Sequence, residues 1–182
     1  MKNIYFYILF LMSYTIFASE QFPDLLLYND KNYEIGNFPM ESYFELYPNR
    51  RPGMTGLNSA LLRGYRAKYE MINNELILMS IETMGISGNW RIVKNNYFRN
   101  RIKVNTYSGK INLFNGRKTG VFMGFTPIYE NYIILEIESG NLIREYEENC
   151  NEYIQSIIQS YPNGSYGQNY FIGLLEQLNN RR

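Results

Sequence analysis

The stretch 65–82, YRAKYEMINNELILMSIE, decides the fold. In its first half, tyrosine, alanine and methionine alternate with charged residues, which is the period-two pattern of a strand with one buried face. Asn73-Asn74 follows, and asparagine tolerates the positive φ angles of a tight hairpin turn. The apolar-rich run 76–82 supplies a returning strand. The stretch therefore predicts an antiparallel β-hairpin.

Two further hairpins are predicted in the same way. One spans 102–113, where apolar residues flank the turn 107–110 (YSGK). The other spans 132–147, where YIILEIE and NLIREYE flank Ser139-Gly140. Earlier in the chain, the segment 24–28 (DLLLY) fits either a short strand or a helical turn.

Helical patterns occur before and after these strands. The segment 39–46 (PMESYFEL) predicts a short helix, because proline is favoured in a first turn and Pro48 follows. Apolar residues spaced i, i+1, i+4 and i+5 predict a helix over about 148–160, and 170–178 carries a second amphipathic stripe. The spacing within 86–100 approximates a helix, although its asparagine-rich composition points away from one.

Strands followed by helices are typical of an α+β domain. We therefore predict a single antiparallel sheet built from hairpins, with two C-terminal helices packed against it. No repeat or long linker interrupts the sequence, so 20–182 is expected to form one domain. The order of the strands in the sheet does not follow from these local patterns.

The first residues have the layout of a secretory signal peptide. Lys2 precedes nine apolar residues, IYFYILFLM, and small residues lead to a cleavage point after Ala18 or Ser19. An uncleaved anchor is the alternative, but the apolar stretch of 4–17 is shorter than the roughly 20 residues that span a bilayer. We predict a signal peptide over 1–19 and an exported chain, periplasmic or secreted, with no stable membrane anchor after cleavage.

Composition excludes several classes of function. The chain has 18 basic and 17 acidic residues, and losing Lys2 with the signal peptide would make them equal, so nucleic acid is not an expected partner. It has no histidine, which excludes serine or cysteine triads that use one. One cysteine excludes an internal disulfide and a four-cysteine metal site. Without a phosphate-binding glycine loop or a calcium-binding register, we expect no metal and no cofactor.

Carboxylates are the remaining catalytic candidates, because glycoside hydrolysis uses a pair of them. Glu130 is expected in a loop between Pro127 and Tyr132, and Glu136 and Glu138 are expected on one face of a strand. The simpler interpretation places strand glutamates on a solvent face. The candidates are Glu70, Glu75, Glu82, Glu130, Glu136, Glu138 and Glu145. No residue is assigned a catalytic role.

The 18 tyrosines suggest recognition instead. Tyrosine offers rigid apolar area with a polar tip, which suits a protein-binding face or a sugar-stacking platform, although strand tyrosines commonly pack a sheet. Arg63, Tyr65 and Glu130 are expected to form an exposed functional cluster if their segments adjoin. Tyr69 and Tyr132 complete the predicted set of binding residues.

Two of these segments carry a resemblance. The segments 63–70 (RGYRAKYE) and 129–137 (YENYIILEI) together resemble a family of uncharacterised bacterial proteins. The resemblance covers roughly 47–146 and implies a shared fold unit. No activity is established for that family, so it carries over no catalytic residue.

These observations favour a non-enzymatic exported protein that binds another protein. An inhibitor or immunity factor in the bacterial envelope is the leading hypothesis. The alternatives are a carboxylate-dependent hydrolase of cell-wall glycan and a passive glycan-binding module.

Overall fold

The computed structural model describes residues 21–53, 59–94, 96–98, 100–122 and 126–180. The predicted signal peptide, 1–19, lies outside these residues. Nine strands form one sheet, mostly antiparallel, and two C-terminal helices contact it, so the predicted α+β class is confirmed. Among the described helices, none has the length and apolar composition needed to cross a membrane.

The sheet has the strand order β2-β1-β3-β4-β9-β8-β7, and the short strands β5 and β6 also pair with β4. β1 and β3 run parallel, whereas the other pairings among the described strands are antiparallel. The strands are β1 (Asp24–Tyr28), β2 (Lys31–Ile35), β3 (Arg66–Ile72), β4 (Glu75–Met84), β5 (Trp90–Ile92), β6 (Ile102–Lys103), β7 (Gly109–Phe122), β8 (Thr126–Glu138) and β9 (Asn141–Asn149).

Two of the three predicted hairpins are confirmed. β3 and β4 pair around Asn73 and Asn74, whose φ angles are 50° and 62°. β8 and β9 pair around Ser139 and Gly140, with φ angles of 47° and 74°. In both cases, the turn residues adopt the positive φ that a two-residue hairpin needs, so local sequence was sufficient.

The predicted hairpin over 102–113 is wrong. Its first arm, β6, pairs with β4, and its second arm belongs to β7, which pairs with β8. β7 is 14 residues long and finds its apolar partners along β8 rather than in the two-residue β6. The helical spacing in 86–100 is also misleading, because Trp90–Ile92 form the strand β5. The guanidinium carbon of Arg66 lies 4.0 Å from the centre of the Trp90 ring. The segment 24–28 is the strand β1.

The predicted helices are present. α2 (Met40–Leu46) matches the segment 39–46. α3 (Cys150–Ser160) begins at Cys150 because Asn149 and Glu152 form a reciprocal capping box. α4 (Tyr166–Asn179) starts earlier than its apolar stripe indicates, because Ser165 accepts the backbone N–H of Gln168 and caps the helix there.

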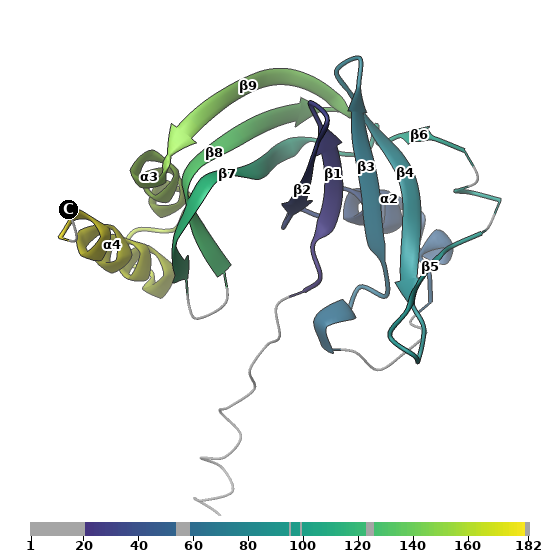
Figure 1. The fold of residues 1–182 in the computed structure, drawn as a ribbon, viewed down its shortest axis with the longest axis horizontal. Helices are drawn as coiled ribbons and strands as arrows, with labels where there is room; N and C mark the ends of the chain where they lie inside the picture. Colours follow the sequence, from purple (N-terminus) through teal and green to yellow (C-terminus); the bar gives the residue numbers. More distant parts are fainter. Residues whose placement is uncertain (1–20, 54–58, 95, 99, 123–125, 181–182) are drawn as a thin grey trace, which may run out of the picture.

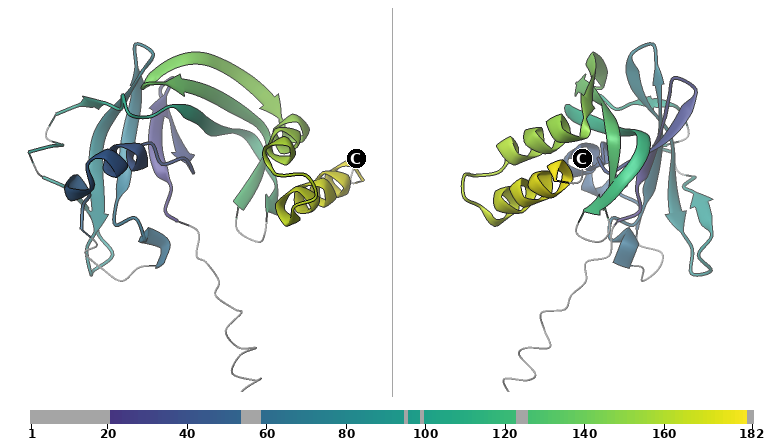
Figure 2. Two further views of the ribbon diagram at one scale, coloured as in Figure 1. Left: turned by 180° about the vertical axis from the view of Figure 1, so that it is seen from behind. Right: turned by 60° about the vertical axis from the view of Figure 1, so that its left-hand side comes forward.

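The sheet is strongly curved (Figure 1). Two apolar clusters pack against it. The main core lies between β1–β4, β7, β8 and α2, which buries Met40 and Phe44 in it. A smaller cluster joins Ile128 of β8 to Ile154 of α3 and Phe171 of α4. α2 therefore lies at one end of the molecule and the C-terminal helices lie at the other (Figure 2).

The turns of the β3–β4 and β8–β9 hairpins meet where strand β4 pairs with strand β9. Their strands share the single register pair Glu75↔Asn141. The backbone N–H of Leu76 donates to the carbonyl of Gly140 (2.8 Å), and that of Leu142 donates to the carbonyl of Asn74 (2.7 Å). A β-carbon at Gly140 would lie 2.7 Å from the Val104 carbonyl oxygen, so only glycine fits this junction.

We expect Gly140→Ala to lower the free energy of unfolding by about 2 kcal/mol or more, because it combines an unfavourable positive φ with a backbone clash. Gly164→Ala is the matched control. Gly164 has a similar φ of 73° and open space around it, so about 1 kcal/mol is expected there. Chemical denaturation of both variants checks this, and equal losses would contradict the proposed close packing at the junction.

Candidate functional site

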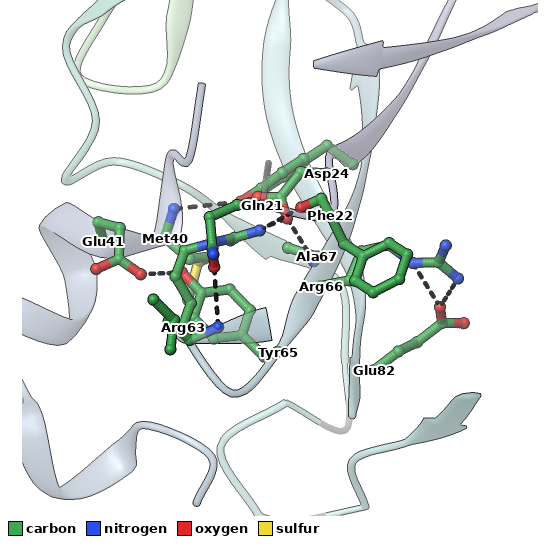
Figure 3. Close-up of polar contacts among 12 residues, drawn as sticks. Gln21, Phe22, Asp24, Met40, Glu41, Arg63, Tyr65, Arg66, Ala67 and Glu82 are labelled. Carbon is green, nitrogen blue, oxygen red and sulfur yellow. Dashed lines mark hydrogen bonds and ion pairs between the residues drawn. The ribbon is translucent and has the colours of Figure 1, made fainter. Parts of the chain in front are cut away.

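A buried carboxylate organises the first half of the chain. Asp24, the first residue of β1, has no exposed surface. It accepts hydrogen bonds from the Ala67 backbone N–H (2.9 Å) and from Nη1 of Arg63 (3.2 Å) (Figure 3). It also accepts one from the Tyr69 hydroxyl (3.2 Å). A buried charge needs such donors, because it has lost its water. The parallel pairing of β1 with β3 places these donors around the carboxylate.

Burial sets the protonation of this site. It raises the pKa of Asp24 to about 6, and the nearby Arg63 charge opposes the rise. Burial and the Asp24 charge raise the pKa of Tyr69 well above its ordinary value. The Tyr69 hydroxyl therefore keeps its hydrogen, which it donates to Asp24.

The same tyrosines hold helix α2 against the sheet. The Tyr69 hydroxyl accepts from the Met40 backbone N–H (3.2 Å) at the start of α2. The Tyr65 hydroxyl donates to Oε1 of Glu41 (2.6 Å), and Arg51 donates a hydrogen bond to each oxygen of that carboxylate (3.0 and 2.8 Å). Burial raises the pKa of Glu41, but the hydrogen bonds from Arg51 and Tyr65 outweigh it, so the pKa is lowered. The first turn of α2 is thus bound to the interior at Met40 and at Glu41.

Arg63 links this network to the segment before β1. Its Nη2 donates to the Phe22 carbonyl (2.7 Å), and its guanidinium carbon lies 3.6 Å from the centre of the Phe38 ring. Only 10% of its side chain is exposed. The structure therefore brings together three of the predicted binding residues, Arg63, Tyr65 and Tyr69. Tyr65 and Tyr69 are 0% and 2% exposed, so they hold the interior together and do not form a surface.

Glu130 and Tyr132 lie elsewhere, on β8, which the sheet order separates from β3 by β4 and β9. The expected loop position of Glu130 is wrong: it lies in β8 opposite an irregular stretch of β7. There it accepts the backbone N–H of Arg117 (3.0 Å) and its Nε (3.1 Å). Tyr132 is 2% exposed and stacks on Tyr153 with 3.7 Å between ring centres. The expected cluster of Arg63, Tyr65 and Glu130 therefore does not form.

The exposed candidate surface lies beside α2 and was missed from the sequence. Arg50, in the 3₁₀ turn η2 (Pro48–Arg50), donates to the Tyr43 hydroxyl (2.6 Å). Its guanidinium carbon lies 4.2 Å from the centre of the Tyr47 ring and 4.7 Å from that of Tyr97. Leu46, Tyr97 and Tyr47 are 64%, 51% and 41% exposed. We call Tyr43, Leu46, Tyr47, Arg50 and Tyr97 the Tyr–Arg surface.

Part of this surface had a sequence signal. Tyr43 and Tyr47 are four residues apart and Arg50 follows three residues later, which is helical spacing for neighbours on one face. By itself, Arg50-Arg51 indicates only two solvent-exposed charges. Tyr97 comes from the irregular segment after β5, and no local pattern connects it with α2.

Comparisons of the chain with protein-family models, with curated proteins and with solved structures find no match.

The Asp24–Arg63 pair gives a pH-dependent prediction. We expect Arg63→Met to lower the free energy of unfolding by about 3–5 kcal/mol at pH 8, because it leaves a buried carboxylate unpaired. The folded-state pKa of Asp24 already lies above its unfolded value, and losing Arg63 raises it further. As the pH falls, the variant therefore recovers stability by binding a proton. Its loss of unfolding free energy should be smaller at pH 5 than at pH 8 by about 1 kcal/mol or more.

Arg66→Met is the matched control for this measurement. Arg66 binds buried Glu82 (2.6 Å), which Lys68 also binds (2.7 Å). Burial raises the pKa of Glu82, but Lys68 and Arg66 together lower it. Lys68 stays beside Glu82 in this variant, so its loss of stability should change less between pH 8 and pH 5 than that of Arg63→Met. Denaturation curves at several pH values test both, and a constant penalty for Arg63→Met would contradict the assignment to Asp24.

Proposed function

We propose that this chain is an exported, non-enzymatic protein that binds a partner protein through the Tyr–Arg surface. Its N-terminal sequence favours export, either to the periplasm or out of the cell. A role as an inhibitor or immunity factor in the bacterial envelope fits a small binding domain of this kind.

The observation that carries the proposal is the setting of Arg50 among three tyrosines. Tyrosine and arginine are enriched in the residues that contribute most to protein–protein affinity. Here the guanidinium is hydrogen-bonded to Tyr43 and lies against the rings of Tyr47 and Tyr97. Because these contacts fix the side chains before any partner arrives, less conformational entropy is lost on binding.

The backbone under this surface is also held in place. Arg51, next to Arg50, is bound to Glu41, which accepts from buried Tyr65. The start of α2 is bound to Tyr69. A rigid support of this kind is typical of a preformed binding surface, on which the interface backbone moves little when a partner binds.

The alternatives receive less support. At the Tyr–Arg surface, the Arg50 guanidinium lies over the rings of Tyr47 and Tyr97, whereas a glycan platform needs an open aromatic face. A glycan hydrolase needs one carboxyl with a raised pKa that reaches substrate. Asp24 has the raised pKa, but it is fully buried and accepts three hydrogen bonds. Glu41 is engaged by Arg51 and Tyr65.

The test uses affinity capture from envelope extract of the source cells, followed by a titration of the captured partner. We expect Arg50→Ala to weaken binding by about tenfold or more, as for a central interface residue. Arg144→Ala is the matched control. The Arg144 guanidinium carbon lies 4.6 Å from the centre of the Tyr146 ring, and both residues are on β9. Its binding should equal that of the unmodified protein.

Both variants should retain the melting temperature of the parent, so that a loss of binding reflects the surface. A partner that binds Arg50→Ala and the parent equally well would contradict the proposed surface. The absence of any saturable protein partner would contradict the proposed function.

A further inference from the structure

A second feature lies at the other end of the molecule, between the sheet and the C-terminal helices. It is a cavity of about 300 Å³ bounded by β7, β8, α3, α4 and the residues after β2. This volume is at the lower limit of ligand pockets, which span roughly 300–1,000 Å³. Most of its wall is apolar and comes from Phe114, Ile128, Ile154, Ile157, Phe171 and Leu174.

The polar groups of the cavity gather at one end. Nδ2 of Asn112 donates to the Tyr153 hydroxyl (3.1 Å), and the Asn112 backbone N–H donates to Oδ1 of Asn37 (3.2 Å). Because the Tyr153 hydroxyl accepts from Asn112, its own hydrogen can be donated to a ligand oxygen. Burial raises the pKa of Tyr153, so the hydroxyl stays protonated.

The charge of the wall limits the class of ligand. No aspartate, glutamate, lysine or arginine is among the described residues that line this cavity. An ionised ligand group would be desolvated there without a counter-charge, which is strongly unfavourable. A neutral ligand with a large apolar part suits this interior.

A polar hollow continues from the same end. It shares Asn37, Asn112 and Tyr153 with the cavity, and Lys110 and Glu148 bring opposite charges to its wall. The two spaces together run from an apolar interior, past amide and hydroxyl groups, to a polar region without an excess of either charge. This change from an apolar to a polar wall complements a molecule with an apolar body and an uncharged polar head.

We infer that the cavity between the sheet and α3–α4 binds a small neutral amphiphile, such as a medium-chain alcohol, with its hydroxyl at Asn37, Asn112 and Tyr153. The site is independent of the proposed partner surface, because the two share no residue. Either can therefore fail without affecting the other.

The test uses the neutral fluorescent probe N-phenyl-1-naphthylamine with the purified full chain. We expect a saturable rise in fluorescence at one probe per chain, and displacement of the probe by 1-decanol. Decanoate has the same chain length and an ionised head, so it should displace the probe at least tenfold less well. No saturable probe binding, or decanoate equal to or better than decanol, would overturn the proposal.

Variants locate the site. Ile157→Trp places a large ring in the cavity and should abolish probe binding, whereas Ile143→Trp, at a 59% exposed position on β9, should not. If Ile157→Trp lowers the melting temperature, Leu174→Trp fills the same cavity from α4 and serves instead. Probe binding that survives a folded, filled variant would overturn the location.

Tyr153→Phe tests the polar end without changing the volume. We expect it to weaken displacement by 1-decanol several-fold while the probe's own affinity changes less, because one ligand hydrogen bond is removed. An unchanged affinity for decanol would overturn the placement of the hydroxyl.

Discussion

The first half of this protein depends on one buried carboxylate. Asp24 lies inside the apolar core, where an ionised group is stable only if donors replace its water. Those donors come from Arg63, Ala67 and Tyr69, so β1 must lie parallel to β3 in one register for the bonds to form. A network of this kind is more restrictive than apolar packing, because a shift of one residue would turn the donors to the other face.

The surface proposed for binding follows from that interior. Tyr69 joins Asp24 to the first turn of α2, and Tyr65 joins the core to Glu41 and thus to Arg51. Arg50 then lies among tyrosines on the outside. The C-terminal helices belong to a separate apolar cluster, and a cavity lies between them and the sheet. One end of the fold thus combines the large apolar core with a buried ionic and hydrogen-bonded network, and the other has a smaller apolar cluster beside a cavity.

Local sequence patterns were sufficient to predict the elements whose partners are close by in the chain. Turn residues and periodicity predicted the hairpins at Asn73-Asn74 and Ser139-Gly140 and the described helices α2, α3 and α4. The hairpin over 102–113 was not, because β7 takes its partner from a strand further along the chain. Arg63, Tyr65 and Tyr69 were among the five predicted binding residues, but Tyr65 and Tyr69 are buried. Their partner, Asp24, is about forty residues away, and nothing in either segment shows that the two meet.

Hydrogen exchange of the α2 amides in Tyr69→Phe tests this account most directly. The substitution keeps the ring and removes the hydroxyl that links Asp24 to the Met40 N–H. We predict faster exchange throughout α2 (Met40–Leu46), with exchange in α3 (Cys150–Ser160) unchanged, because the helices belong to different clusters. Unchanged protection of α2, or an equal loss in both helices, would contradict the claim that the Asp24 network holds α2 and the surface beside it.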